Sequence, residues 1–121
     1  MPEKKLLLID DDTELCEELA EVFTGEGYST QYTPDPVEGV NIIKNGSFHA
    51  VILDYKMKQL TGIDVLNMLK EAGQKPKVLM ISGRPFIENL VKEHGLTDMV
   101  IGVLSKPVDI GVLLAKIKSI E

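Results

Sequence analysis

Short apolar runs and longer amphipathic stretches alternate five times along the chain. Four of the apolar runs are almost entirely hydrophobic, which is typical of strands buried on both faces of a parallel sheet. The remaining run, YSTQY, alternates polar and apolar residues, which indicates a half-buried strand at an edge of the sheet. The five predicted strands lie at residues 6–9, 28–32, 50–53, 77–81 and 100–104.

Each predicted strand is followed by residues with helical spacing. In the first of these stretches Leu15, Leu19 and Phe23 recur on one face, and Gly25 is expected to end the helix. Asp35 is expected to cap the second helix, and the third is expected over residues 63–72. The fourth helix follows Pro85, and Asp109 is expected to cap the fifth.

Five strand–helix repeats predict an α/β fold. Right-handed crossovers would cover both faces of the sheet with helices, which gives a doubly wound, flavodoxin-like, five-stranded parallel sheet of order 2-1-3-4-5 with five helices. In such sheets ligands bind at the carboxyl ends of the strands, near the point where the strand order reverses. The side chains at the five strand ends are therefore the candidates for function.

Composition and charge restrict the class of protein. The 121 residues fit a single domain, 1–121, and hydrophobic (44%) and charged (26%) residues are balanced as in soluble proteins. A net charge of −6 argues against nucleic acid or an anionic membrane as a direct partner. No apolar stretch reaches the roughly 18 residues of a membrane span, and the single cysteine, Cys16, excludes an intrachain disulfide. We expect a cytoplasmic protein.

Acidic, hydroxyl and basic side chains follow four of the five predicted strands. They are Asp10, Asp11 and Asp12 after the first, Asp54 after the third, Ser82 after the fourth and Lys106 after the fifth. Because clustered carboxylates repel, they are stable together only beside a cation. Hard oxygen ligands favour Mg²⁺, and Mg²⁺ beside a hydroxyl and a lysine suits a phosphoryl group.

A run of acids after a strand also has a simpler interpretation. Taken alone, three aspartates are more typical of a solvated turn or of a helix start favoured by the helix dipole. The coincidence of suitable residues at several strand ends favours a common site.

Four motifs carry a resemblance to a known family. IDDD, VILDYKM followed by TG, MISG and LSKP occur in this order, and the chain resembles the receiver domains of bacterial two-component response regulators from residue 4 to about residue 120. The resemblance implies a switch domain rather than a stand-alone enzyme. Its partners would be a sensor histidine kinase or phosphotransfer protein, and a downstream protein or a fused output domain.

The resemblance also implies a role for each site residue. Asp54 would accept the phosphoryl group, and Ser82 and Lys106 would contact that group once it is attached. Mg²⁺ would be bound by Asp10, Asp11, Asp54 and the backbone carbonyl of Lys56. Asp12 would not be a ligand, and its simpler interpretation as an acid in the first helical turn is preferred. The Lys106–Pro107 bond would be cis.

The sequence departs from the family pattern in three places. Val103 stands where an aromatic residue is usual, so switching would use loop and helix shifts instead. Lys58 stands where proline is usual, so the loop after the third strand is expected to be more mobile. Residues 95–106 form a longer segment than usual, which predicts an irregular fourth helix or following loop.

Two other functions stay open. Asp10 and Asp12 fit the start of the D-x-D-x-[TV] motif of haloacid-dehalogenase-type phosphatases, but Glu14 occupies the Thr or Val position and a late acidic pair is missing. A phosphorylation-independent, receiver-like binding module is the second alternative, because Val103 and Lys58 depart from the pattern.

Overall fold

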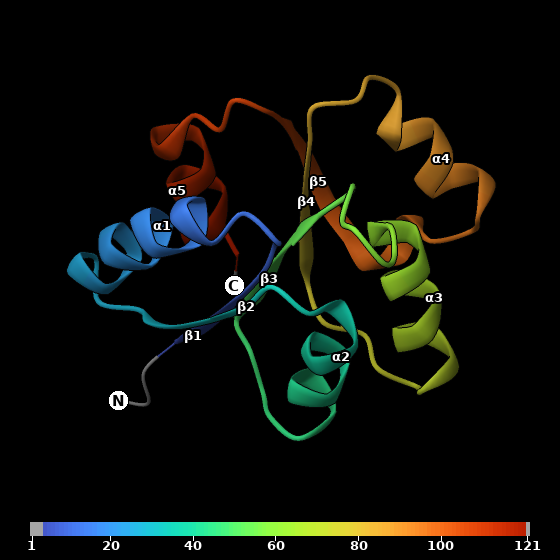
Figure 1. Cartoon of the computed structure of the whole chain (residues 1–121), viewed down its shortest axis with the longest axis horizontal. Coiled ribbons are helices and arrows are strands. Elements are labelled where there is room, and N and C mark those ends of the chain that lie inside the picture. The colour runs from blue at the N-terminus through green and yellow to red at the C-terminus, as the bar shows by residue number, and fades with distance from the viewer. Residues whose placement is uncertain (1–3, 121) are drawn as a thin grey trace.

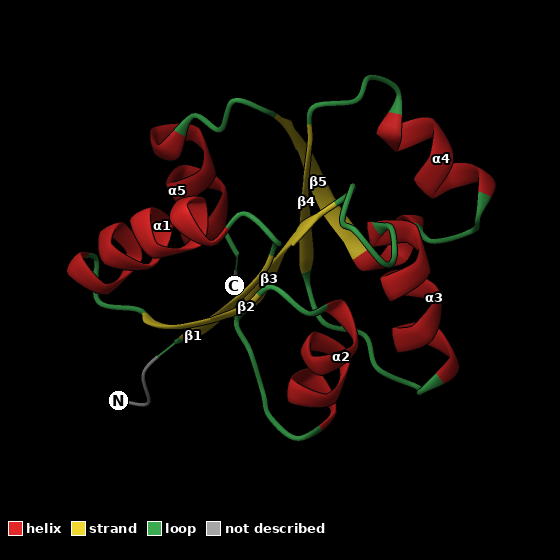
Figure 2. Ribbon diagram, in the orientation of Figure 1, coloured by secondary structure: helices red, strands yellow, loops and turns green. Residues whose placement is uncertain are grey.

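Five parallel strands form a central sheet of order β2–β1–β3–β4–β5 in the computed structural model, which describes residues 4–120. This is the predicted topology, with β2 at one edge (Figures 1 and 2). The YSTQY strand is displaced by one residue from its predicted position. The strands are β1 Lys5–Ile9, β2 Ser29–Thr33, β3 Ala50–Asp54, β4 Val78–Ser82 and β5 Val100–Ser105.

Helices cover both faces of the sheet. Figure 2 shows α1 and α5 on one face and α2, α3 and α4 on the other. No helix within residues 4–120 is long and apolar enough to span a membrane. The helices are α1 Thr13–Gly25, α2 Pro36–Lys44, α3 Gly62–Glu71, α4 Ile87–Glu93 and α5 Ile110–Lys118, with a short 3₁₀ turn, η1, at Thr97–Met99.

The core has two layers, one on each side of the sheet. Alternate side chains of β1 point to opposite layers, so Leu6 and Leu8 pack with Phe23 of α1, while Leu7 and Ile9 pack with α2 and α3. All four of these β1 side chains are at most 1% exposed. The burial of apolar surface stabilises the fold by about 25 cal/mol for each Å² removed from water, and this is the main force that holds helices on both faces.

Side-chain caps fix where α1, α2, α3 and α5 begin. Asp35 and Asp109 cap α2 and α5 as predicted, and Thr61 forms a reciprocal capping box with Asp64 at the start of α3. Asp12 is the N-cap of α1 and accepts a hydrogen bond from the Leu15 amide at 3.1 Å, so it precedes the first turn in which it was predicted to lie. The difference arises because the carboxylate satisfies a free amide at the helix start.

The segment between α4 and β5 is irregular, as predicted. Helix α4 has only seven residues, and it starts after Phe86, whose backbone is left-handed with φ of 64° and which makes no side-chain cap. The η1 turn follows, and the pairing of β4 with β5 shifts register between Val78 and Leu79. The predicted cis Lys106–Pro107 bond is present after β5.

Candidate functional site

Three carboxylates meet at the carboxyl edge of the sheet. One oxygen from each of Asp10, Asp11 and Asp54 lies within 4.8 Å of the others. They meet because β1 and β3 are adjacent in the sheet, with Ile9 beside Leu53. Asp10 and Asp54 are each 3% exposed, and Asp11 is half-buried. Such close and buried negative charges favour a bound cation.

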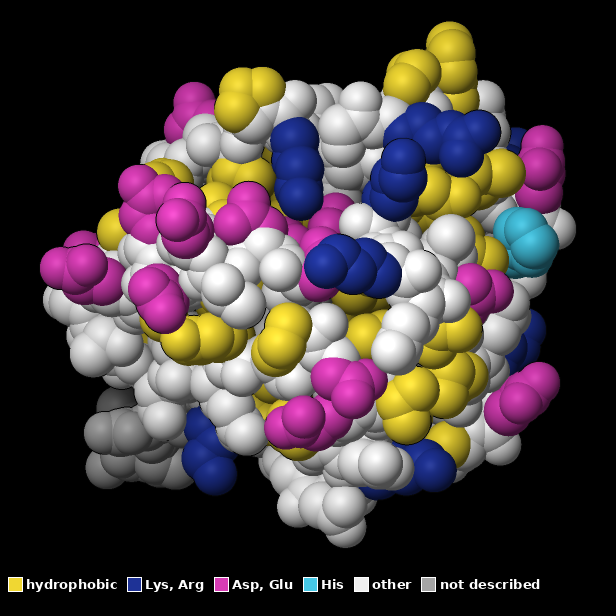
Figure 3. Space-filling view, in the orientation of Figure 1, with side chains coloured by type: hydrophobic (Ala, Val, Ile, Leu, Met, Phe, Trp, Pro, Cys, Tyr) yellow, Lys and Arg dark blue, Asp and Glu magenta, His cyan; other side chains and the backbone are white. Residues whose placement is uncertain are grey.

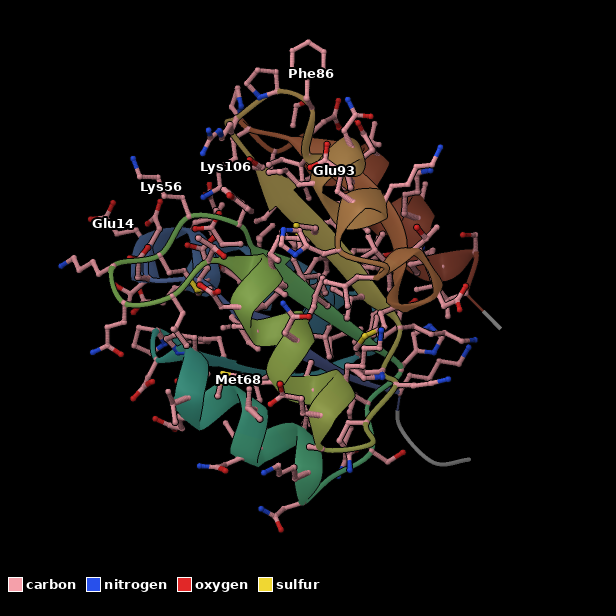
Figure 4. All side chains as sticks on the ribbon, turned by 90° about the vertical axis from the view of Figure 1, so that its right-hand side faces the viewer. Glu14, Lys56, Met68, Phe86, Glu93 and Lys106 are labelled. Carbon is pink, nitrogen blue, oxygen red and sulfur yellow. The ribbon has the colours of Figure 1, made fainter. Side chains whose placement is uncertain are left out.

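Lys106 brings a positive charge to this cluster. Its ammonium nitrogen lies 3.2 Å from Asp54 Oδ1 and 3.4 Å from Asp10 Oδ2. Its backbone N–H donates to the carbonyl of Ser82 at 2.8 Å, which fixes the start of the β5–α5 loop beside the end of β4. Figure 4 shows the Lys106 side chain at the same rim of the sheet as Lys56.

The pKa values of Asp54 and Lys106 reflect this crowding. Burial, reinforced by the Asp10 carboxylate and opposed by the Lys106 ammonium, raises the pKa of Asp54 to about 6. Burial alone would lower the pKa of Lys106, but the carboxylates of Asp10 and Asp54 together raise it above its ordinary value. Lys106 therefore stays charged and only partly neutralises the cluster.

The three consecutive aspartates have different partners. Asp10 Oδ1 accepts from the Asp12 amide at 3.0 Å, while Asp10 Oδ2 faces Lys106. Asp11 Oδ2 accepts from the backbone N–H of Lys58 at 3.1 Å. Asp12 caps α1 and lies outside the carboxylate cluster, so only the first two aspartates join Asp54.

Ser82 reaches the rim, but its hydroxyl is bonded to the following loop. It ends β4 at 4% exposure, one residue beyond Ile81, which pairs with Asp54. The hydroxyl accepts from the Arg84 amide at 2.9 Å and donates to the Arg84 carbonyl at 3.3 Å. In this conformation the Ser82 hydroxyl therefore bonds to its own loop.

The β3–α3 and β4–α4 loops enclose a cavity beside the cluster. Its volume is ≈ 650 Å³, whereas the smaller hollow near Asp11 has a volume of ≈ 240 Å³. The exposed Lys56 and the buried Ser82 both line it, and the Arg84 guanidinium lies 6.0 Å from the centre of the Tyr55 ring. Sequence reasoning missed Tyr55 and Arg84, although Tyr55 directly follows Asp54 and Arg84 lies two residues after Ser82.

Charge is divided across this face of the molecule. Figure 3 shows acidic side chains over α1 and Lys and Arg side chains near the loops that follow β3 and β4. The exposed acids of α1 are Glu14, Glu17, Glu18 and Glu21, and the exposed cations of the two loops are Lys56, Lys58 and Arg84.

Comparisons with known proteins agree with the fold. The family model described as "Response regulator receiver domain" matches residues 6–118. The response regulator MprA of Mycobacterium sp. (strain KMS) is 30% identical over 116 residues, which cover 96% of this chain and 50% of that protein. The probable transcriptional regulatory protein SilR of Salmonella typhimurium is 28% identical, with the same coverage.

A solved structure shows the same architecture. The CheY-like receiver domain protein from Methanospirillum hungatei JF-1 is 28% identical, with a TM-score of 0.85 over 97% of this chain and 92% of that chain. The chain spans about half the length of the curated relatives it matches. The extent of the family match shows that this chain belongs to the response regulator receiver domain family.

Proposed function

We propose that the chain is a phosphorylation switch in which Asp54 accepts a phosphoryl group from a phosphohistidine. The donor would be a sensor histidine kinase or a phosphotransfer protein. A carboxylate oxygen of Asp54 attacks phosphorus and the P–N bond breaks. The electron pair stays on the imidazole nitrogen, which takes up a proton from solvent. The observation that carries this proposal is the convergence of Lys106 and two further carboxylates on Asp54.

The cluster also supports a magnesium site. Its donors are carboxylate oxygens, which Mg²⁺ prefers, and their separation allows one ion to contact all three. Asp10, Asp11, Asp54 and the backbone carbonyl of Lys56 would hold the ion. When bound, Mg²⁺ would neutralise charge on the phosphoryl oxygens.

Lys106 and Ser82 would respond to the new group. The Lys106 ammonium already lies beside Asp54 and would pair with a phosphoryl oxygen. The Ser82 hydroxyl would leave Arg84 and donate to another oxygen, which would move the β4–α4 loop. Because Val103 replaces the usual aromatic residue, the change would pass through loops and α4 rather than through a ring.

The output would depend on a downstream partner. The curated relatives are about twice as long as this chain, which supports a fused output domain, and a separate partner protein would serve the same purpose. We assign residues 1–121 to a single receiver domain that acts as a switch and not as a stand-alone enzyme.

Labelling with acetyl phosphate tests the proposal. With Mg²⁺, intact-mass spectrometry should show one added phosphoryl group, and EDTA should prevent the addition. Asp54→Asn should not be labelled. Asp12→Asn is the matched control, because asparagine also caps a helix and Asp12 lies outside the cluster. It should be labelled as the wild type is.

The same experiment separates the two alternatives. Labelling at Asp10, together with beryllofluoride trapped there, would favour the phosphatase. No labelling of the wild type, with Asp54→Asn indistinguishable in partner binding, would favour the phosphorylation-independent module.

A further inference from the structure

A backbone hydrogen bond joins the β3–α3 loop to the carboxylate cluster. The N–H of Lys58 donates to Asp11 Oδ2 at 3.1 Å, although the two residues are 47 positions apart. The donor is a main-chain group, so it does not depend on the lysine side chain, which is exposed.

The loop that carries this amide is held at both ends. Where β3 ends, the Tyr55 carbonyl accepts from the Gly62 amide at 2.6 Å. Inside that bond, Lys56 and Thr61 form an antiparallel bridge, and the side chain of Met57 is 7% exposed. The Lys58 amide is therefore presented by an anchored loop.

Of the three carboxylates in the cluster, Asp11 is the one whose side chain is least restrained by burial. Asp10 and Asp54 are buried and share the Lys106 ammonium, whereas Asp11 is half-buried. Repulsion from the other two carboxylates favours rotation of the Asp11 side chain towards solvent. The charge-assisted bond from Lys58 opposes this rotation and keeps an Asp11 oxygen within 4.8 Å of its neighbours.

We infer that the backbone N–H of Lys58 positions Asp11 for a divalent cation, so that the β3–α3 loop contributes to metal affinity through its main chain. This inference rests on the proposed magnesium site. Lys58 is a positioning residue, and its side chain is dispensable for this role. Hydrogen bonds to a ligating carboxylate orient it and commonly change metal affinity by about 10–100-fold.

The coupling must act in both directions. If the Lys58–Asp11 bond strengthens Mg²⁺ binding, then bound Mg²⁺ strengthens the bond by the same factor. The Lys58 amide hydrogen should therefore exchange with solvent more slowly when Mg²⁺ is present.

Two substitutions at one position separate the amide from the side chain. Lys58→Ala keeps the N–H and removes the ammonium, whereas Lys58→Pro removes the N–H. Mg²⁺ titration of the full chain by calorimetry should show about tenfold weaker binding for Lys58→Pro and a change within about twofold for Lys58→Ala. Equal affinities of the two variants would overturn the inference. A wild type that binds no Mg²⁺ would overturn the proposed metal site, and the inference with it.

Amide exchange measured by NMR provides a test without proline. In the wild type, exchange at Lys58 should slow on addition of Mg²⁺, and Asp11→Ala should speed it in the absence of metal. Faster exchange with Mg²⁺, or no effect of Asp11→Ala, would overturn the inference even if Lys58→Pro fails to fold.

Discussion

The ammonium of Lys106 lies 3.2 Å from the carboxylate of Asp54, although their strands β5 and β3 are separated by β4. The lysine side chain extends across the end of β4 and also reaches Asp10, at 3.4 Å. One cation thus serves two buried carboxylates, and the cluster keeps a net negative charge. This balance between attraction and repulsion determines how the site should respond to substitution and to pH.

Removal of the Lys106 ammonium should slow phosphorylation. In Lys106→Ala, nothing at this position would lower the pKa of Asp54 or neutralise the incoming phosphoryl group, so Mg²⁺-dependent labelling by acetyl phosphate should be at least about tenfold slower. Lys118→Ala is the control, since its ammonium forms an exposed ion pair with Glu26 at 2.6 Å. A Lys106→Ala rate equal to that of Lys118→Ala would contradict the assigned role.

Asp54 should make stability depend on pH. Its pKa is raised from 3.8 to about 6 in the folded chain, so its stabilising contribution is complete below 3.8 and is lost as the pH rises through about 6. Asp54→Asn cannot lose that contribution. In EDTA, the free energy of unfolding of Asp54→Asn relative to that of the wild type should increase between about pH 4 and pH 7, by as much as about 3 kcal/mol. Urea unfolding at several pH values measures this, and a constant difference would count against the raised pKa.

Gly62 should resist substitution, because α3 begins against the backbone of β3. A Cβ at this position would lie 3.0 Å from the Asp54 carbonyl oxygen and 3.2 Å from Tyr55 Cα, and neither backbone atom can move freely. Gly62→Ala should reduce the free energy of unfolding by about 1–3 kcal/mol.

The matched control is Gly25→Ala in the last turn of α1. A Cβ there meets nothing within 4 Å, and alanine favours helix by up to about 1 kcal/mol. Urea denaturation should therefore show opposite signs for the two variants. A Gly62→Ala protein as stable as the wild type would show that α3 can shift away from β3.

Cys16 should be unreactive in the folded protein. Burial, reinforced by the Asp10 carboxylate, raises the pKa of its thiol to about 12, and the residue is 1% exposed. Since the thiolate is the reactive form, alkylation by iodoacetamide should be at least about a hundredfold slower in buffer than in urea. Mass spectrometry of quenched samples gives both rates, and similar values would mean that the α1–β1 contact opens readily.

The sequence was sufficient for most of the fold, because local rules and burial agree. Strands β1, β3 and β4 are apolar runs buried on both faces, and Asp35 and Asp109 cap helices where expected. The order of the strands then brought Asp10, Asp11 and Asp54 to one edge, as predicted.

Features that depend on backbone direction were not predictable. The bond from Lys58 to Asp11 uses an amide that every residue except proline carries, so no residue type signals it. The left-handed backbone of Phe86 has no glycine or asparagine to indicate it. The greater mobility expected of the loop after β3 stays a prediction, although the same Lys58 amide ties that loop to Asp11.

The hydroxyl of Ser82 can close the turn with Arg84 or face a group on Asp54, but it cannot do both. Ordinary hydrogen bonds of this kind each contribute about 1 kcal/mol net, and 1.4 kcal/mol corresponds to a factor of ten in population. If the exchange costs one or two such bonds, roughly one unmodified molecule in five to thirty already holds the alternative loop arrangement. The unmodified protein would then have a low basal output even without a phosphoryl donor. Substitution of residues that contact only this turn would raise or lower that output.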